Sequence, residues 1–152
     1  AGVVFLNKAD RHNRNLAAAW FLGGYLRNWI GEPEEAIRWF EHAMRLSPLD
    51  TEMFRTQTGV AFAHLIARRF DESRQWAEKA FRAVPQFMLA AGVIAASAAL
   101  AGRMEEAKRA MAEVRKLDPS LRVSGLDALL HFRRPEDAAL FAEGLRQAGL
   151  PE

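Results

Sequence analysis

The chain has 152 residues, of which 50% are hydrophobic and 26% are charged, and it contains no cysteine. This length and composition allow one packed core and argue against global disorder, while the lack of cysteine excludes a disulfide scaffold, a cysteine-ligated zinc site and a thiol nucleophile. The 21 basic and 19 acidic residues leave a net charge of only +2 without a basic block, so we expect no nucleic-acid partner.

The local pattern predicts helices throughout. Ala, Leu, Arg, Glu and Met are abundant, and apolar residues recur at intervals of three and four, as at Ile37, Phe40 and Met44. No alternation of apolar and polar residues indicates strands. The longest uncharged stretch, residues 84–102, is mostly alanine and too weakly hydrophobic for a membrane span, so we expect no membrane association.

The expected helices form pairs along the chain. Residues 1–15 are interpreted as the second helix of a truncated earlier repeat. The first helices of three further pairs are expected at about residues 17–30, 52–67 and 88–101. In each pair a turn follows, and then a second helix that a proline ends, at Pro48, Pro85 and Pro119.

The three turns share a repeated sequence. Segments beginning at residues 30, 67 and 101 align with one another, and Gly31 and Gly102 allow the left-handed backbone angle that a tight turn often needs. An acidic pair follows each turn, where the dipole of the next helix favours negative charge. These pairs are Glu34 and Glu35, Asp71 and Glu72, and Glu105 and Glu106.

Two adjacent glycines, Gly23 and Gly24, lie inside the first of these helices, where each costs about 1 kcal/mol relative to alanine. Close packing of helices explains them most simply. A phosphate-binding loop is the alternative, but no Lys-Ser/Thr follows and no strand precedes.

The C-terminal stretch, residues 122–152, departs from the repeat. A short helix is expected from Ser124, with a spacing similar to a capping box. A last helix is expected to begin at Pro135 and to end at Gly149. We expect this helix to cap the final repeat.

The repeat resembles the tetratricopeptide repeat (TPR), a 34-residue helix–turn–helix unit. Residues 17–50 match best, residues 88–121 match moderately, and residues 52–87 form a degenerate repeat with Arg68 in its turn. The matching positions of the first repeat are Trp20, Gly24, Gly31, Ala36, Phe40, Ala43 and Pro48. The resemblance implies a single all-α TPR domain over residues 1–152, built as a right-handed superhelix of antiparallel helix pairs. Where that family has an Asn-Pro-Asn turn, this chain has Arg14 in place of the proline.

A second resemblance concerns the segments at residues 31–36, 44–50, 132–137 and 144–152. These look like the C-terminal TPR region of bacterial class III adenylate/guanylate cyclase-like proteins, in which a cyclase domain precedes the array. The resemblance implies a cytoplasmic regulatory arm of a signalling protein, with cyclic nucleotide synthesis carried out by a domain that this sequence does not contain. Similar arrays also follow winged-helix domains in bacterial transcription regulators.

We expect no catalytic residue, cofactor or metal site. The four histidines, His12, His42, His64 and His131, do not share a helix face, and no serine lies in a Gly-x-Ser-x-Gly motif. The acidic pairs resemble acid/base pairs, but their recurrence at one place in each repeat favours the helix-dipole interpretation.

The expected function is binding of a protein or peptide in a groove lined by the first helices. The candidate groove residues are Phe21, Tyr25, Asn28, Trp29, Arg55, Thr58, Phe62 and Leu65, and the third unit offers Leu89, Gly92 and Ala96. Alternatively, these residues pack on neighbouring helices or on the C-terminal tail. A structural or dimerisation arm, with a homodimer through the truncated N-terminal end, is the competing hypothesis.

Overall fold

The computed structural model describes the backbone of residues 2–152 and the side chains of Lys8 and of residues 11–152. Helices account for the regular structure of this part of the chain, and no strand occurs in it. Their bounds are α1 Gly2–Ile30, α2 Pro33–Leu46, α3 Met53–Ile66, α4 Phe70–Ala83, α5 Met88–Leu100, α6 Met104–Leu117, the 3₁₀ turn η1 Val123–Gly125, α7 Leu126–Leu129 and α8 Pro135–Ala148.

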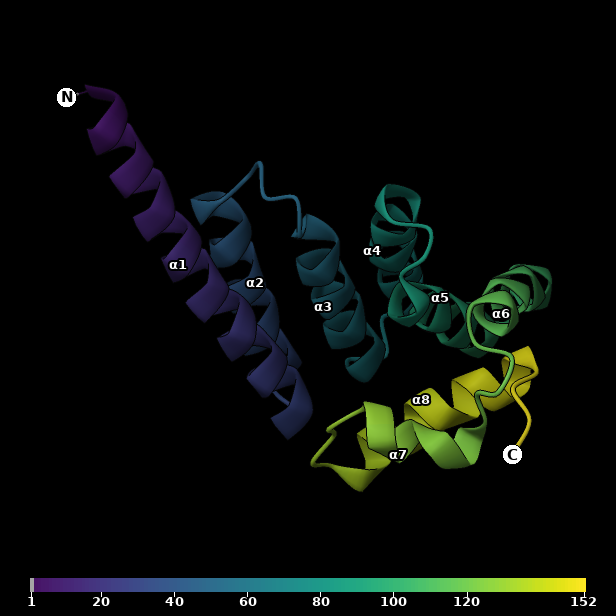
Figure 1. Ribbon diagram of the computed structural model, residues 1–152. Coiled ribbons are helices and arrows are strands. Elements are labelled where there is room, and N and C mark those ends of the chain that lie inside the picture. The colour runs from purple at the N-terminus through teal and green to yellow at the C-terminus, as the bar shows by residue number, and fades with distance from the viewer. Residues whose placement is uncertain (1) are drawn as a thin grey trace.

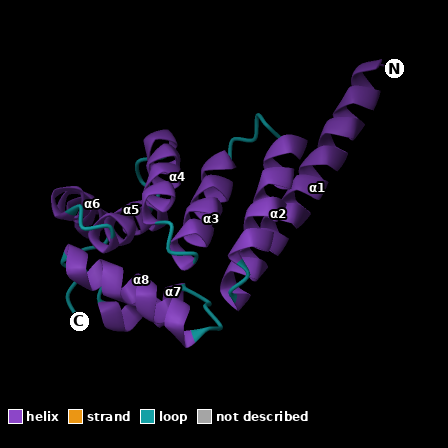
Figure 2. Cartoon of the chain, turned by 180° about the vertical axis from the view of Figure 1, so that it is seen from behind, coloured by secondary structure: helices purple, strands orange, loops and turns teal. Residues whose placement is uncertain are grey.

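The first six helices stack in the order of the chain. Each odd-numbered helix packs against the even-numbered helix that follows it, and each pair contacts the next through α2 with α3 and α4 with α5. Figure 1 shows this row, with the two termini at opposite ends, and Figure 2 shows it from behind. The predicted all-α TPR-like solenoid with a C-terminal capping helix is therefore confirmed. The division into repeats at residues 17–50, 52–87 and 88–121 stays an interpretation of the sequence.

One prediction about the N-terminal region is wrong. Residues 1–15 were expected to form a separate helix before a turn, but α1 continues without a break from Gly2 to Ile30. The physical reason lies at Arg14, which stands where the family has proline. Arginine keeps its backbone N–H and is a good helix former, so nothing at this position ends the helix.

The turns within the three pairs have one backbone geometry. Gly31 and Gly102 have φ angles of 82° and 79°, and Arg68 occupies the equivalent place with a φ of 62°. A side chain in this left-handed region costs about 1 kcal/mol, so the degenerate second repeat keeps the turn at an energetic cost.

The acidic residues that follow the turns lie in the first turns of α2, α4 and α6, as the dipole argument requires. Two of them also bind an arginine of the next repeat. Arg69 bonds Glu34 at 2.7 Å, and Arg103 bonds Asp71 at 2.9 Å. The bond to Asp71 raises the pKa of the Arg103 guanidinium. Both arginines directly precede the second helix of their repeat, so each pair connects equivalent positions of consecutive repeats.

Three glycines of the first helices, Gly23, Gly24 and Gly59, pack against aromatic rings. An ideal Cβ at Gly24 would lie 2.6 Å from the ring of Phe40, and one at Gly59 would lie 2.4 Å from the same ring. Phe40 is fully buried, so its ring lies between α1 and α3 at two positions that have no side chain. Gly23 similarly accommodates Trp39, which confirms that close packing explains the glycine pair.

The C-terminal elements cover the last repeat from the inner side. α8 packs mainly against α5, where Gly144 meets the backbone of Ala96 so closely that an ideal Cβ would lie 2.9 Å from its oxygen. Pro135 begins α8, and Gly149 ends it with a φ of 114°, as predicted. The short helix is present as η1 and α7, but no side chain caps it. In the part of the chain that the structure describes, no helix is long and apolar enough to cross a membrane.

Replacement of Gly59 by alanine tests the role of the Phe40 ring. Because the ring also lies against Gly24, it cannot move away from a new methyl group at residue 59. The methyl group therefore overpacks the interface at a cost of about 1–3 kcal/mol. This cost exceeds the gain of about 1 kcal/mol in helix propensity. We expect Gly59→Ala to lower the free energy of unfolding in urea, whereas Gly125→Ala, which has open space around it, leaves it unchanged. Phe40→Leu should relieve part of this cost in the double variant. Strictly additive effects of Gly59→Ala and Phe40→Leu would contradict the argument.

Candidate interaction groove

The inner surface of the row is formed by the first helices of the repeats, α1, α3 and α5. Four of the eight candidate groove residues are fully buried and expose no surface for a ligand. These residues are Asn28, Thr58, Phe62 and Leu65, and the prediction that they line an open groove is wrong.

Each of the four has a structural role. Asn28 donates from Nδ2 to the carbonyl oxygen of Gly59 at 2.9 Å, which links α1 to α3. Thr58 donates its hydroxyl to the Phe54 carbonyl oxygen, one turn earlier in its own helix. Phe62 and Leu65 belong to the main hydrophobic core. Repeat phase places these residues on the inner side, but helices and the C-terminal segment cover them there.

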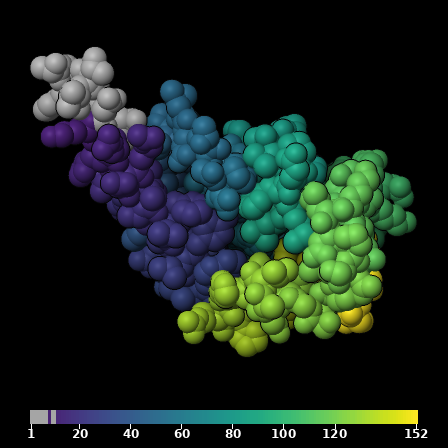
Figure 3. All heavy atoms as spheres, in the orientation of Figure 1, coloured from purple at the N-terminus to yellow at the C-terminus, as the bar shows by residue number. Residues whose placement is uncertain are grey.

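A segment of the chain itself, around Phe132 and Arg133, occupies the groove beside the C-terminal ends of α1 and α3. This part is called the lower groove. The ring of Phe132 meets that of Trp29 edge-on, with centroids 4.8 Å apart, and it also packs against Phe62 and Phe141. The backbone N–H of Arg133 donates to the carbonyl oxygen of Trp29 at 2.7 Å. In Figure 3 this yellow-green segment lies directly below the end of α1. The alternative that the C-terminal tail covers groove residues is therefore correct for this part.

The third repeat is covered as well. Gly92 and Ala96 are buried, with Phe141 and Gly144 of α8 packed over them. Leu89 is half-buried and remains at the edge of the open region.

The groove stays open at its other end, beside the starts of α3 and α5, and this part is called the upper groove. A cavity of about 250 Å³ extends from α1 across α3 to the beginning of α5. Four predicted residues line it, Phe21, Tyr25, Arg55 and Leu89, together with Leu22 and Phe87. The sequence did not predict Leu22 and Phe87 as groove residues, because the repeat phase places neither of them at an inner position of a first helix.

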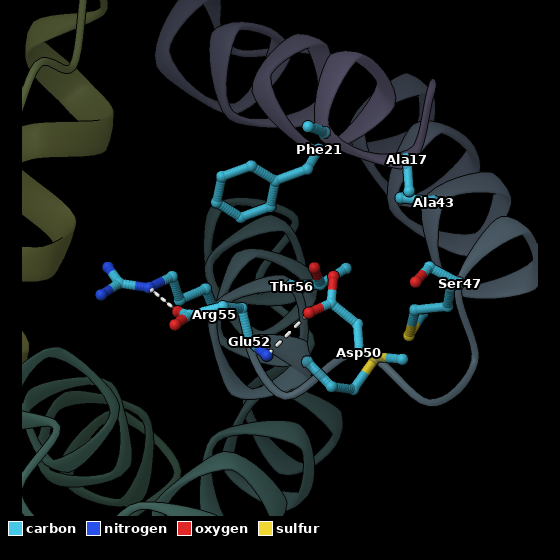
Figure 4. Close-up of a pocket in the computed structure, with 11 residues that line it drawn as sticks. Ala17, Phe21, Ala43, Ser47, Asp50, Glu52, Arg55 and Thr56 are labelled. Atoms are coloured by element: carbon cyan, nitrogen blue, oxygen red, sulfur yellow. Dashed lines mark hydrogen bonds and ion pairs between the residues drawn. The ribbon is translucent and has the colours of Figure 1, made fainter. Parts of the chain in front are cut away.

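A second cavity of about 230 Å³ adjoins the first, because Phe21 and Arg55 line both. Figure 4 shows it between α1, the end of α2 and the start of α3, with Arg55 on one side and Ser47 on the other. Asp50 accepts a hydrogen bond from the backbone N–H of Glu52 at 2.8 Å and so holds the loop that forms its floor. The proline-ended second helix supplies this loop, and nothing in the helical periodicity predicted it.

Arg55 is the central group of the open region. Its side chain is half-exposed, and its guanidinium carbon lies 5.2 Å from the ring centre of Phe54 and 5.7 Å from that of Phe87. Nε donates to the Glu52 carboxylate. The Tyr25 hydroxyl donates to the Arg55 carbonyl oxygen at 2.8 Å, and burial raises the pKa of this phenol, which keeps it a neutral donor. The arginine is thus positioned by two aromatic rings and a fixed backbone.

Among the side chains that the structure describes, no three histidine, aspartate or glutamate residues are grouped so that they could hold a metal ion. What the open region offers chemically is apolar surface, one positioned cation and nearby carboxylates. This combination of apolar, cationic and anionic groups can bind a ligand.

Loss of the Phe132 ring should uncover the lower groove. We expect Phe132→Ala to lower the free energy of unfolding by about 2 kcal/mol and to speed hydrogen exchange of the Arg133 amide more than tenfold. Leu129→Ala removes a half-exposed side chain of the same segment and should change stability by less than about 0.5 kcal/mol. Equal effects of both variants would show that the Phe132 contact does not hold the segment in place.

Comparison with known proteins supports the fold. No family model matches the sequence, and no curated protein matches it. Among solved structures the chain is similar to PilW, a widely conserved type IV pilus biogenesis factor, with a TM-score of 0.59 and 21% sequence identity. The match covers 92% of this chain and 62% of PilW, so the chain spans less than two thirds of that protein's length. Similarity at this identity establishes the fold alone.

Proposed function

We propose that the chain is a non-catalytic module that binds an extended peptide in the open upper groove around Phe21, Tyr25 and Arg55. The observation that carries this proposal is the pair of adjoining cavities that share Phe21 and Arg55. The similarity to a pilus biogenesis factor is in keeping with a role outside catalysis.

The residues that line the open groove define the peptide. Both cavities have largely apolar walls, of which Phe21, Leu22, Phe87 and Met53 are examples, so they accept aliphatic or aromatic side chains. The guanidinium of Arg55 can form a bidentate bond to a carboxylate. The ligand is therefore an extended segment with an apolar residue and a neighbouring acidic residue.

Peptide selection against the immobilised chain tests this function. From a phage-displayed library of random linear peptides we expect enrichment of sequences that combine an apolar side chain with Asp or Glu. Arg55→Ala should weaken binding of the best fluorescein-labelled peptide tenfold or more, because a hydrogen bond between charged groups contributes about 1.5–3 kcal/mol. Fluorescence polarisation measures this change.

Arg82→Ala is the matched control, because Arg82 is an exposed arginine on α4 that lines neither cavity. It should leave peptide affinity unchanged, and circular dichroism should show the same helicity for both variants. Enrichment without acidic residues, or affinity that Arg55→Ala does not alter, would contradict the proposed site.

We further infer that this module is the C-terminal regulatory arm of a bacterial adenylate cyclase-like protein and acts in the cytoplasm. Support for this finer proposal comes from the sequence resemblance at residues 31–36, 44–50, 132–137 and 144–152. In such a protein the arm recruits or senses a partner, and a separate domain makes the cyclic nucleotide. The sensory half of a winged-helix regulator is the alternative with the same fold.

The coding sequence upstream of Ala1 distinguishes these two parents. We expect it to encode a class III cyclase domain with metal-binding carboxylates. A winged-helix domain at that place would support the regulator instead, and any other domain would contradict both. The purified chain alone should neither form cyclic AMP nor bind a nucleotide.

A further inference from the structure

The two adjoining cavities of the open groove carry more negative than positive charge. Arg55 is the one basic residue among the described residues that line them, whereas Asp50 and Glu52 are acidic. Nε of Arg55 donates a hydrogen bond to the Glu52 carboxylate, which Figure 4 marks with a dashed line. The cation on which the proposed peptide binding depends is thus already paired in the free chain.

Arg55 nevertheless keeps donors for a ligand. Its side chain is 51% exposed, and Nε is the only guanidinium nitrogen with a hydrogen-bond partner in the part of the chain that the structure describes. A guanidinium is a planar fork that binds carboxylates along more than one edge. A peptide carboxylate can therefore bind Nη1 and Nη2 beside Glu52, or it can displace Glu52 from Nε.

The local structure holds Glu52 close to Arg55. Glu52 directly precedes α3 and lies three residues, or about one helical turn, before Arg55. Its backbone N–H donates to the Asp50 carboxylate at 2.8 Å, which fixes the loop. The Glu52 side chain makes no capping bond to the helix, and its carboxylate bonds no other described residue than Arg55. Its position therefore bears on the arginine more than on the helix end.

Glu52 is not needed to position Arg55. The rings of Phe54 and Phe87 flank the guanidinium, and the Tyr25 hydroxyl bonds the backbone of the same residue. An exposed ion pair between residues three apart contributes little to holding a side chain in place. A ligand carboxylate on the same guanidinium, in contrast, lies close to Glu52 and is repelled by it. The main effect of Glu52 on an acidic ligand is therefore unfavourable.

We propose that Glu52 determines the specificity of the groove as an internal competitor for Arg55, an inference that rests on the proposed function. A ligand carboxylate must share the guanidinium with Glu52 or displace it, whereas an uncharged ligand meets no such cost. An acidic residue alone thus gains little from Arg55. Only a peptide that also fills the apolar walls binds, and acidic polypeptides in general are rejected.

The variant Glu52→Gln tests this role, because it removes the charge and keeps the size of the side chain. The probe is the best fluorescein-labelled acidic peptide from the selection. We expect Glu52→Gln to lower its Kd about fivefold at low salt, and by less at high salt, where the repulsion is screened. The same peptide with its acidic residue replaced by the corresponding amide should bind the variant and the unaltered chain equally. Fluorescence polarisation measures both peptides.

Glu143→Gln is the matched control. Glu143 is also an exposed acid that pairs with an arginine three residues away, Arg146, at 2.7 Å, but it lies on α8 and lines neither cavity. This variant should leave the Kd of both peptides unchanged. Circular dichroism should show the same helicity for the two variants.

A measurement without peptide tests whether Glu52 occupies Arg55. The Nε–H signal of Arg55 in nuclear magnetic resonance spectra is assigned by its loss in Arg55→Ala. We expect this proton to exchange with solvent at least threefold faster in Glu52→Ala than in the unaltered chain, because its hydrogen bond is lost. An unchanged exchange rate would overturn the proposal.

The binding outcomes separate the two proposals. An acidic peptide that binds through Arg55 with the same Kd in Glu52→Gln as in the unaltered chain would overturn the role of Glu52 and leave the groove intact. A gain in affinity that the amide peptide shares would also overturn it, since repulsion between charges could not be the cause. Binding that Arg55→Ala does not alter would contradict the groove itself, and the role of Glu52 with it.

Discussion

The Phe40 ring, enclosed between two helices that lack a side chain at the points of contact, sets the geometry of the first half of the molecule. Gly24 and Gly59 leave the space that the ring occupies, so α1 and α3 approach the Phe40 side of α2 more closely than residues with a Cβ would allow. The rings of Phe21 and Tyr25 contact Phe40 from the inner side, with centroids 6.4 and 5.2 Å away. Because Tyr25 in turn bonds the backbone of Arg55, the packing of a single buried ring determines where the groove residues of two repeats stand relative to each other.

The C-terminal segment divides the inner surface into two regions with different properties. Over α5 and the lower ends of α1 and α3, aromatic contacts to Phe132 and Phe141 replace solvent, and the surface becomes part of the core. Above it, the first helices keep a positioned arginine between two apolar cavities. The segment that fills the lower region makes the contacts expected of a bound peptide, an inserted aromatic ring and a backbone hydrogen bond to a helix end. The chain itself therefore occupies the lower surface, whereas the upper surface stays open.

The sequence predicted the helix pairs, the glycine turns, the acidic first turns and the capping helix, because each depends on local chemistry that recurs at a fixed spacing. It failed where burial depends on elements distant in the chain. Asn28 and Tyr25 lie one turn apart on the same helix. Asn28 is fully buried against α3, whereas Tyr25 borders a cavity, and their spacing in the sequence does not predict this difference. The missed cavity near Ser47 and Asp50 is formed by a loop whose shape follows from the packing of α2 on α3. The turn predicted near Arg14 is wrong for a different reason. It was inferred from the resemblance to the TPR family, although arginine at this position favours a helix.

Leu22 lines the upper groove although its side chain is 60% exposed. It lies on the same helix as Phe21 and Tyr25, and this helix is continuous from Gly2 to Ile30. The rings of Trp39 and Phe40 on α2 pack against Gly23 and Gly24 of α1. The contacts that hold the first helix pair together therefore also place the groove residues of α1, and the shape of the groove depends on the packing behind it as much as on the residues that line it.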